Sequence, residues 1–394
     1  MDRFGDKICC NPTVKLKKQE SYPVIDIDKI THGYKAVRSV ASIEYTGQGG
    51  AKFQDHDVLF ARITPCLENG KMAIADTEGQ NGIGSTELFV FRGIDGVSDT
   101  DYVYYLLCMK HIRQLAANSM TGASGRQRAD LDFIKRIQWD FPDIEMQKKI
   151  ASVLSAYDNL IEVNNKRIKV LEQMAENLYK EWFVRFRFPG HETAEFENGI
   201  PEGWAYRRAD EVIDFNPTLK TGNQTEFTII PMEALSTNSM VLDSGCFVRQ
   251  DSISGRRSQN GDTLLAKITP CLENGKTGFV MGMPENEVLG GSTEFVVMRS
   301  KALTPHYVYC IARSYYFRQT AILSMNGADG RQRVDEDKLK SAKILQPEKT
   351  VLDHFETIVT PIFDGVYQMV QENKNLIQQR DLLLPRLMSG KLEV

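Results

Sequence analysis

The chain has 394 residues, of which 42% are hydrophobic and 25% are charged, and its formal net charge at pH 7 is -4. This composition is typical of globular proteins with apolar cores and excludes a largely disordered chain. No apolar run approaches the roughly 18 residues that span a bilayer, and the first residues lack the pattern of a signal peptide. We therefore expect a cytoplasmic protein with no membrane partner.

Seven cysteines, including the adjacent Cys9 and Cys10, are spread along the chain. Their number and spacing do not fit a secreted disulfide framework, and the six histidines show no metal-ligand spacing. We expect reduced thiols and no bound metal.

The sequence contains an internal repeat with an offset of 205 positions. The segment ITPCLENGK occurs at 63–71 and again at 268–276. NPTVK near the start matches NPTLK in the second half, and both halves contain GRQR in the same order. Two long copies favour a duplicated globular domain over a solenoid.

Each copy is predicted to mix strands and helices. Apolar segments with the length and flanking residues of strands occur at 57–63, 71–76 and 86–91, and their counterparts at 262–268, 277–282 and 293–298. A helix is expected from about Asp101 to Asn118. Its counterpart is expected from Pro305 to about Ser324, with Thr304 suited to the N-cap.

A heptad pattern follows each copy and predicts two long helices that pack against each other. Pro361 is expected to break or kink the first turns of the second helix, so that its regular part begins near Thr360. Asn164 and Asn373 either fix the register of an antiparallel pair or are exposed at a loose edge. The predicted seam includes Ile150, Leu154, Ile161, Asn164, Ile168 and Leu171 of the first helix and Ile362, Met369, Asn373 and Leu376 of the second.

The predicted fold class is α+β, with two related domains joined by two long antiparallel helices about a pseudo-two-fold axis. The first domain is expected at 1–145 and its helix at 146–188, and the second domain at 189–347 with its helix and tail at 348–394. Two related heads in inverted orientation suit the reading of two half-sites on opposite DNA strands.

Over nearly its whole length, the chain resembles the specificity subunit of type I restriction-modification systems. The resemblance is carried by the paired segments HDVLFARITPCLENGK and GDTLLAKITPCLENGK, by the junction GRQRADLDFIKRIQWDFPDIEMQKKIASVL, by NLIEVNNKRIKVLEQMAENLYKEWFV and by the ending NKNLIQQRDLLLPRLMSGKLEV. It implies two target recognition domains that bind a split duplex DNA target. It also implies that the helices set the gap between the half-sites and dock two modification subunits.

The resemblance further implies that this chain is not an enzyme and holds no cofactor. Adenine methylation with S-adenosylmethionine belongs to the modification subunits, and cleavage with ATP and Mg²⁺ belongs to restriction subunits. The two recognition domains of such subunits are often dissimilar, whereas these are clearly related. We therefore expect half-sites that are similar or identical when read on opposite strands.

Other functions are a two-headed adaptor that binds protein partners and the specificity subunit of a related bifunctional restriction enzyme. Catalysis by this chain is disfavoured, because NPTV and NPTL lack the second proline and the aromatic residue of an adenine methyltransferase loop. We expect these segments to be turns entering the first strand. Glu68 and Lys71 are spaced to lie on opposite sides of a strand, and Cys66 and Cys271 are expected to be small buried residues.

The leading DNA-binding candidates are two loops, because guanidinium and amide groups hold phosphates and read base edges. Alternatively, the loop arginines cap the preceding helix or pair with Asp130 and Asp335. The loop candidates are Arg126, Gln127, Arg128, Arg331, Gln332 and Arg333.

Within the shared nine residues, groove contact and a shared structural role are both open. The candidates there are Thr64, Asn69 and Lys71 and their counterparts Thr269, Asn274 and Lys276. Base reading is expected where the copies differ, at 15–54 and 220–260. The candidates in those segments are Arg38, Gln48, Lys52, Gln54, Arg249, Arg256, Arg257 and Gln259. Trp182 and Phe183 are either partner anchors or core contacts with the following domain.

Overall fold

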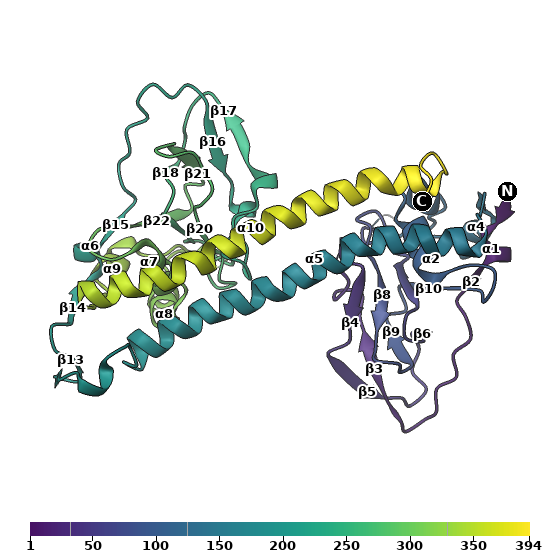
Figure 1. The fold of residues 1–394 in the computed structure, drawn as a ribbon, viewed down its shortest axis with the longest axis horizontal. Helices are drawn as coiled ribbons and strands as arrows, with labels where there is room; N and C mark the ends of the chain where they lie inside the picture. Colours follow the sequence, from purple (N-terminus) through teal and green to yellow (C-terminus); the bar gives the residue numbers. More distant parts are fainter. Residues whose placement is uncertain (32, 124, 329) are drawn as a thin grey trace. The chain divides into compact units, whose positions relative to one another are not determined.

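The computed structural model describes residues 1–31, 33–123, 125–328 and 330–394, which form two compact units (Figure 1). Unit 1 comprises Met1–Val163 and Glu372–Val394, and unit 2 comprises Asn164–Gln371. Two long helices, α5 (Ile144–Tyr179) and α10 (Lys349–Met388), contribute a segment to each unit. The predicted mixture of helices and strands is therefore present.

Unit 1 contains two main sheets. The first has the order β2 (Ile8–Cys10), β10 (Leu88–Gly93), β7 (Val58–Ala61), β8 (Met72–Asp76) and β4 (Ala36–Arg38). The second has the order β5 (Ala41–Glu44), β3 (Ser21–Ile25), β9 (Gly82–Gly84) and β6 (Ala51–Phe53). A short pair joins β1 (Asp2–Arg3) to β11 (Gln138–Trp139). The helices are α1 (Phe4–Lys7), α2 (Thr100–Cys108), α3 (Lys110–Asn118) and α4 (Leu131–Arg136).

Unit 2 repeats this strand order with its own segments, except that its first sheet, as far as the chain is described, has four strands and no counterpart of β4. One sheet has the order β15 (Ile213–Phe215), β22 (Phe295–Ser300), β19 (Thr263–Ala266) and β20 (Thr277–Phe279). The other has the order β17 (Val248–Gln250), β16 (Phe227–Ile230), β21 (Leu289–Gly291) and β18 (Arg256–Ser258). Smaller pairs join β12 (Phe196–Glu197) to β13 (Ile200–Pro201) and β14 (Ala205–Arg208) to β23 (Lys343–Gln346).

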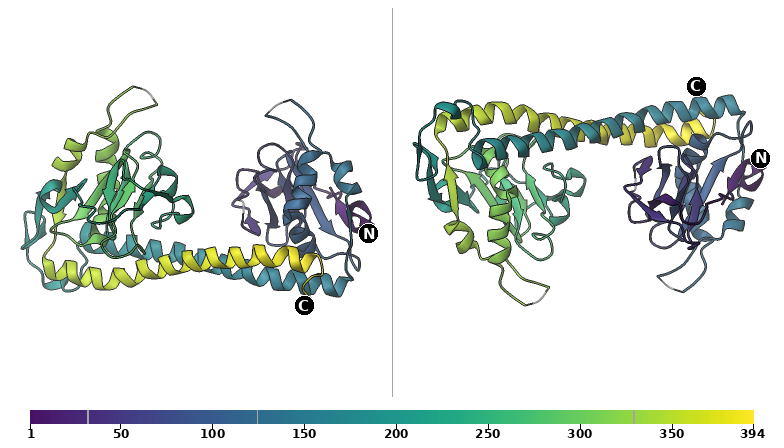
Figure 2. Two further views of the ribbon diagram at one scale, coloured as in Figure 1. Left: turned by 90° about the horizontal axis from the view of Figure 1, so that it is seen from above. Right: turned by 90° about the horizontal axis from the view of Figure 1, so that it is seen from below.

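The remaining helices of unit 2 are short. They are α6 (Ala209–Val212), α7 (Pro305–Arg313), α8 (Tyr315–Leu323) and α9 (Glu336–Ser341), with 3-10 turns at His191–Thr193, Met232–Ala234 and Ser244–Cys246. Figure 2 shows from two sides that the strands of each unit lie on one side of that unit's stretch of α5 and α10.

The central strand of each unit is buried on both faces, which explains its unbroken apolar sequence. Val58 and Phe60 of β7 pack into a core with α2. Leu59 and Ala61 point into a second cluster that includes residues of β3 and β6. In unit 2, neighbouring leucines of β19 divide between two clusters in the same way.

Each helix expected after the strands is in fact two helices. The first breaks at Met109 and the second at Ser314, where the backbone is extended. The Ser314 side chain accepts a hydrogen bond from the Phe317 amide, so it caps a new helix. Thr304 occupies the expected N-cap position, but its side chain makes no capping hydrogen bond.

The prediction that Pro361 breaks the second long helix is wrong, because α10 runs unbroken through it. Pro361 itself is exposed, whereas Val359, Phe363 and Val366 around it are fully buried. Burial stabilises by about 1.5–3 kcal/mol for each large apolar side chain, which together exceeds the roughly 3 kcal/mol cost of an interior proline.

The predicted helix seam is partly buried. Ile150, Leu154, Ile161 and Ile168 are buried, whereas Leu171, Ile362, Met369 and Leu376 are half-buried. Asn164 is 1% exposed and Asn373 is 8% exposed, so the alternative of a loose exposed edge is wrong for both.

The ends of the two long helices contribute to the cores. In unit 1, Ile150 and Leu154 share a core with Leu384 and Leu387. After Tyr179, the first helix continues as a π-helical turn, Lys180–Val184. In unit 2, Trp182 and Phe183 of this turn lie against Phe355 with ring centroids 5.9 and 5.0 Å away, so they are core contacts.

Candidate nucleic-acid interface

The ITPCLENGK segment forms a compact loop with the same geometry in both units. The Asn69 amide donates to the Pro65 carbonyl at 2.9 Å, and the Lys71 amide donates to the Cys66 carbonyl at 2.9 Å. Leu67 is buried and anchors the loop in the core. The Thr64–Pro65 peptide is cis, as is its counterpart Thr269–Pro270.

This loop is joined to the Arg-Gln-Arg loop by main-chain hydrogen bonds. In unit 1, the Thr64 amide donates to the Gln127 carbonyl at 3.0 Å, and the Ala129 amide donates to the Arg62 carbonyl at 2.8 Å. In unit 2, the Thr269 amide donates to the Gln332 carbonyl at 3.0 Å. Two motifs about 60 positions apart in sequence thus form one paired-loop surface in each unit.

The paired-loop surface projects away from the unit's own helix segments. Figure 2 shows the loop between α3 and α4 in unit 1, and the loop between α8 and α9 in unit 2, on the side away from α5 and α10. Ser124 and Asp329, which belong to the Gly-containing loops of the sequence analysis, lie outside the described residues.

Within the nine-residue motif, threonine and lysine make internal contacts. The Lys71 ammonium donates to the Ile27 carbonyl at 3.2 Å, and the Lys276 ammonium donates to the Met232 carbonyl at 3.2 Å. The Thr269 hydroxyl donates to the Gln332 carbonyl at 3.2 Å, and the Thr64 hydroxyl makes a similar contact. These contacts fit the structural alternative.

Among the candidates of the motif, Asn69 and Asn274 are exposed, next to the exposed carboxylates of Glu68 and Glu273. The Asn69 and Asn274 side chains do not take part in the hydrogen bonds to main-chain carbonyls that hold the threonine and the lysine of each motif. They are therefore the motif's candidates for an external ligand.

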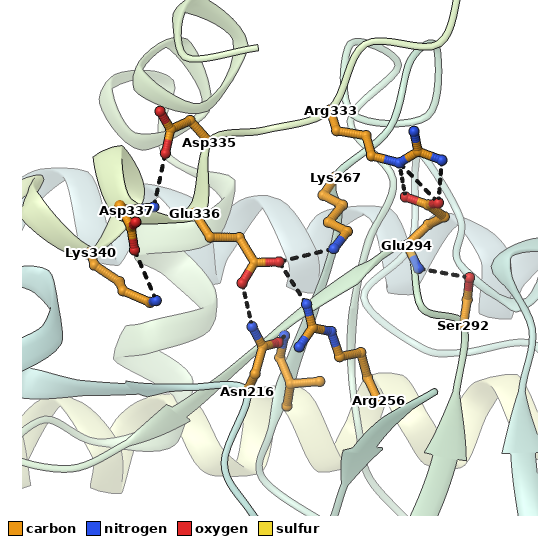
Figure 3. A network of polar contacts seen from close by, with 11 residues as sticks. Asn216, Arg256, Lys267, Ser292, Glu294, Arg333, Asp335, Glu336, Asp337 and Lys340 are labelled. Atoms are coloured by element: carbon orange, nitrogen blue, oxygen red, sulfur yellow. Dashed lines mark hydrogen bonds and ion pairs between the residues drawn. The ribbon is translucent and has the colours of Figure 1, made fainter. Parts of the chain in front are cut away.

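Arg128 and Arg333 each form a bidentate salt bridge with a glutamate. The Arg128 Nε lies 2.9 Å from Glu87 Oε2 and its Nη2 lies 2.5 Å from Oε1. Arg333 makes the equivalent contacts with Glu294, at 2.9 and 2.7 Å (Figure 3). Hydrogen bonding from the arginine lowers the pKa of each glutamate, which keeps the carboxylate ionised.

The alternative that these arginines pair with Asp130 and Asp335 is therefore wrong. Both aspartates cap the following helix, because Asp130 accepts from the Asp132 amide at 2.8 Å and Asp335 accepts from the Asp337 amide at 3.1 Å. Among the described residues, the Arg126 and Arg331 side chains are exposed and make no hydrogen bond or ion pair. Their donors point to solvent.

The candidates in the variable segment of unit 1 make mostly local contacts. Arg38 pairs with Glu78, and the Lys52 ammonium donates to the Tyr45 hydroxyl at 2.7 Å. The Gln48 side chain donates to the Glu44 carbonyl at 3.0 Å and accepts from the Thr46 amide. Gln54 is exposed.

The candidates of unit 2 are also tied to the protein. Arg249 pairs with Glu287 at 3.4 Å, and Arg257 donates to the Leu219 carbonyl. The Gln259 side chain donates to the Asn286 carbonyl at 3.1 Å. A DNA contact by any of these groups would compete with an existing intramolecular partner.

A polar cluster in unit 2 was not predicted from the sequence. Glu336 accepts hydrogen bonds from Asn216 at 2.8 Å, from Arg256 at 2.7 Å and from Lys267 at 2.9 Å (Figure 3). At the equivalent position 205 residues earlier, unit 1 has Leu131. The only sequence indication was this exchange of a carboxylate for an apolar side chain.

Unit 1 uses the equivalent place differently. Arg62, at the position of Lys267, lies over the Phe89 ring with its guanidinium carbon 4.7 Å from the centroid. Ala51 stands where unit 2 has Arg256. The two paired-loop surfaces therefore have different charged neighbours.

The rejected enzymatic motifs have ordinary structural roles. Asn11 has a φ of 48° and accepts from the Val90 amide at 2.8 Å, so NPTV is a turn as predicted. It follows strand β2, however, and does not precede the first strand. The prediction of buried Cys66 and Cys271 is wrong, because both are half-buried.

Two features are absent from the described residues. They contain no group of three His, Cys, Asp or Glu side chains arranged to hold a metal. Of the helices in the described part of the chain, none has the length and apolarity needed to cross a membrane.

Comparisons with known proteins agree on one family. Residues 8–173 match the family model described as the type I restriction modification DNA specificity domain. The MjaVIII specificity subunit of Methanocaldococcus jannaschii is 23% identical and covers 100% of this chain and 92% of its own. The MjaIX specificity subunit of the same organism is 25% identical and covers 77% and 72%.

A solved structure has the same fold. The crystal structure of the S subunit of a type I restriction-modification system from M. genitalium aligns with a TM-score of 0.55 and 13% identity, over 98% of this chain and 94% of that one. The resemblance stated from the sequence is confirmed. Since the relatives are specificity subunits, the comparisons indicate a specificity role rather than an enzyme.

Proposed function

We propose, from the premise that residues 8–173 are a type I restriction modification DNA specificity domain, that this chain selects a split duplex DNA target with one half-site per unit. The observation that carries the proposal is the paired-loop surface, which both units build from the same motifs on the same strand order. A function performed twice by one chain accounts for keeping this surface in both halves.

The chemistry of the surface suits a DNA backbone. Arg126 and Arg331 present exposed guanidinium groups, and phosphate contacts fix the position of a protein on duplex DNA without reading its sequence. Loops shared by both units are suited to this task. Base reading is then left to the segments that differ, including the region of Arg256 and Glu336.

The two long helices are proposed to form an antiparallel coiled coil that relates the domains by a pseudo-two-fold axis and sets the gap between the half-sites. Supporting this, the start of α5 shares a core with the end of α10 in unit 1, and the end of α5 packs against the start of α10 in unit 2. We propose that two modification subunits dock on this chain and that restriction subunits join them. S-adenosylmethionine, ATP and Mg²⁺ are assigned to those partners.

The test is single-molecule mapping of adenine methylation in cells that express this chain with its neighbouring modification subunit. Cells that lack this chain are the control. Methylation at one split motif that disappears without the chain is the expected result, with half-sites that share bases on opposite strands. An unchanged methylation pattern would contradict the proposal, and half-sites without common bases would contradict the expected similarity.

A further inference from the structure

A buried polar contact joins the recognition domain and both helices within unit 1. Asp158 of α5 has a side chain only 3% exposed and pairs with Arg380 of α10. The same carboxylate accepts a hydrogen bond from the Tyr105 hydroxyl of α2 at 2.5 Å. Burial and the Asp158 charge raise the pKa of Tyr105, so its hydroxyl stays protonated and donates. The aspartate thus has a neutral donor and a cationic partner.

The equivalent place in unit 2 is apolar. An offset of 205 positions converts Tyr105 into Cys310 and Asp158 into Phe363, and Arg380 corresponds to Ala175. All three unit 2 residues are buried in one core. Phe363 packs edge-on against aromatic neighbours there, with its ring centroid 4.4 Å from that of His306.

The helix segments pair in the same register in both units. Trp182 lies against Phe355 in unit 2, and their counterparts Leu387 and Ile150 lie in one core of unit 1. Asp158 of α5 pairs with Arg380 of α10, and their counterparts Phe363 and Ala175 belong to one core of unit 2, as the shared register requires.

Because the two halves of the chain are related, each long helix could pair either with the other long helix of its own chain or with the same helix of a second copy. The first half of the chain has a helix that fits either α10 of its own chain or α5 of a second copy. In the second arrangement, Asp158 would face Ala175 of the other copy, and in a pair of two α10 helices Arg380 would face Phe363. The pair of two α5 helices leaves the buried Asp158 without its cation, which lowers an association constant about a hundredfold or more per site. In the pair of two α10 helices, Arg380 keeps only its largely exposed neighbour Asp381.

We propose that the Tyr105–Asp158–Arg380 contact is a pairing determinant, which makes the first-half helix accept the second-half helix and reject a second copy of itself. A single buried polar residue selects partners in coiled coils by the same principle. This role is independent of DNA binding, because it concerns only which helix segments meet.

The test uses the full chain and asks which helices meet after refolding. Light and ¹⁵N-labelled chains are mixed, unfolded, refolded together and treated with an amine cross-linker. Lys166 is exposed and lies midway between positions 158 and 175. In a pair of two α5 helices it would therefore lie beside its own counterpart, and a mixed-isotope Lys166–Lys166 product identifies that pair alone.

Two neutral variants and one matched control decide the outcome. D158N/R380M removes both charges, and Y105C/D158F/R380A gives unit 1 the residues that unit 2 already packs. Both are expected to raise the Lys166–Lys166 product about a hundredfold over the wild type. D158R/R380D keeps a pair with reversed polarity and is expected to remain at the wild-type level.

Three results would overturn the inference. One is a neutral variant that is folded by circular dichroism and gives no more product than the wild type. Another is an amount of Lys166–Lys166 product from D158R/R380D that equals the amount from the neutral variants. It would mean that weakened packing rather than charge matching releases the helices. The third is failure of both neutral variants to fold, which would assign the contact to folding itself.

Discussion

At the scale of single residues, the two arginines of each loop differ in whether their side chains already have a hydrogen-bond partner. Arg128 and Arg333 each commit two nitrogen atoms to a glutamate, whereas Arg126 and Arg331 commit none among the described residues. The sequence predicted that these loops are basic and exposed. It could not separate the two arginines of each loop, because Glu87 lies 41 positions from Arg128.

Replacing both Arg126 and Arg331 with alanine is expected to weaken binding to duplex DNA of any sequence. Each lost phosphate contact should reduce the slope of log affinity against log salt by about 1. Fluorescence anisotropy titrations at several salt concentrations measure this slope. Arg207→Ala, at an exposed arginine of β14, is the control, and an unchanged slope in the double variant would contradict the assignment.

A second prediction concerns His56, whose Nε2 lies 3.4 Å from Asp101. The hydrogen bond that His56 donates to Asp101 raises the pKa of His56 above 6.5. Burial raises the pKa of Asp101, but this effect is outweighed by hydrogen bonds from His56 and Lys35, which lower that pKa to about 2. Because the folded pKa of His56 exceeds the unfolded value, its stabilisation is present below pH 6.5 and is lost as pH rises through the folded pKa.

His56→Gln should therefore lower the melting temperature at about pH 5.5 and leave it nearly unchanged at about pH 8.5. The effect should be at most about 1 kcal/mol, because the histidine is largely exposed. Thermal unfolding across this range is the measurement, with His111→Gln on α3 as an exposed control. A difference that grows with pH would have the wrong sign for this pair.

At the scale of elements, the strands were predictable and the helix breaks were not. β7 is apolar over four residues and β19 over three because each lies between two cores, and that pattern is visible in the sequence. The break at Met109 has no capping side chain to mark it in the sequence, whereas Ser314 is an N-cap residue whose capping hydrogen bond only the structure shows. The break predicted at Pro361 is absent, because the free energy gained by burying its neighbours outweighs the local cost of the proline.

Pro361→Ala should stabilise the protein by about 1–3 kcal/mol, because it restores an amide donor in the middle of an intact helix. Denaturant unfolding followed by circular dichroism gives the free energy. Asp364→Ala, one turn away at another exposed position, controls for the intrinsic helix propensity of alanine. Loss of stability in the proline variant would mean that the proline ring contributes contacts of its own.

Another element-scale prediction concerns the arginine that holds the turn before β7. Asp57 is 1% exposed and accepts from Arg92 of β10 at 2.5 and 2.7 Å. Arg92→Met leaves a buried carboxylate unpaired and should cost about 3–5 kcal/mol in the free energy of unfolding. D57N/R92M should cost less, and equal losses in both variants would show that the charge is not the cause.

At the scale of the whole molecule, the internal repeat predicted the organisation better than local patterns predicted any single helix or strand. The repeat identifies the equivalent positions of the two units directly from the sequence. The strand orders of the two units match except for β4, the edge strand of unit 1, which has no counterpart in the described part of the equivalent sheet of unit 2. The exchange of Leu131 for Glu336 shows what the repeat could not predict, namely how similar frames acquire different charges.

The proposed role of the helices as a spacer makes a quantitative prediction. Inserting one heptad into the middle of both α5 and α10 adds about 10 Å of helix, which corresponds to about three base pairs. Methylation mapping should then find the same two half-sites with a gap about three base pairs longer. Insertion into one helix alone should abolish methylation, and an unchanged gap in the double insertion would contradict the spacer role.

The division of unit 1 between two stretches of chain has a consequence for synthesis. Unit 2 is a continuous stretch, Asn164–Gln371, so all of it is translated before Arg380, Leu384 and Leu387 are added to the chain. Those residues cover Asp158, Ile150 and Leu154 in unit 1. The unit whose translation begins first is therefore the last to be completed, and a chain truncated after residue 371 contains all of unit 2 but only an incomplete unit 1.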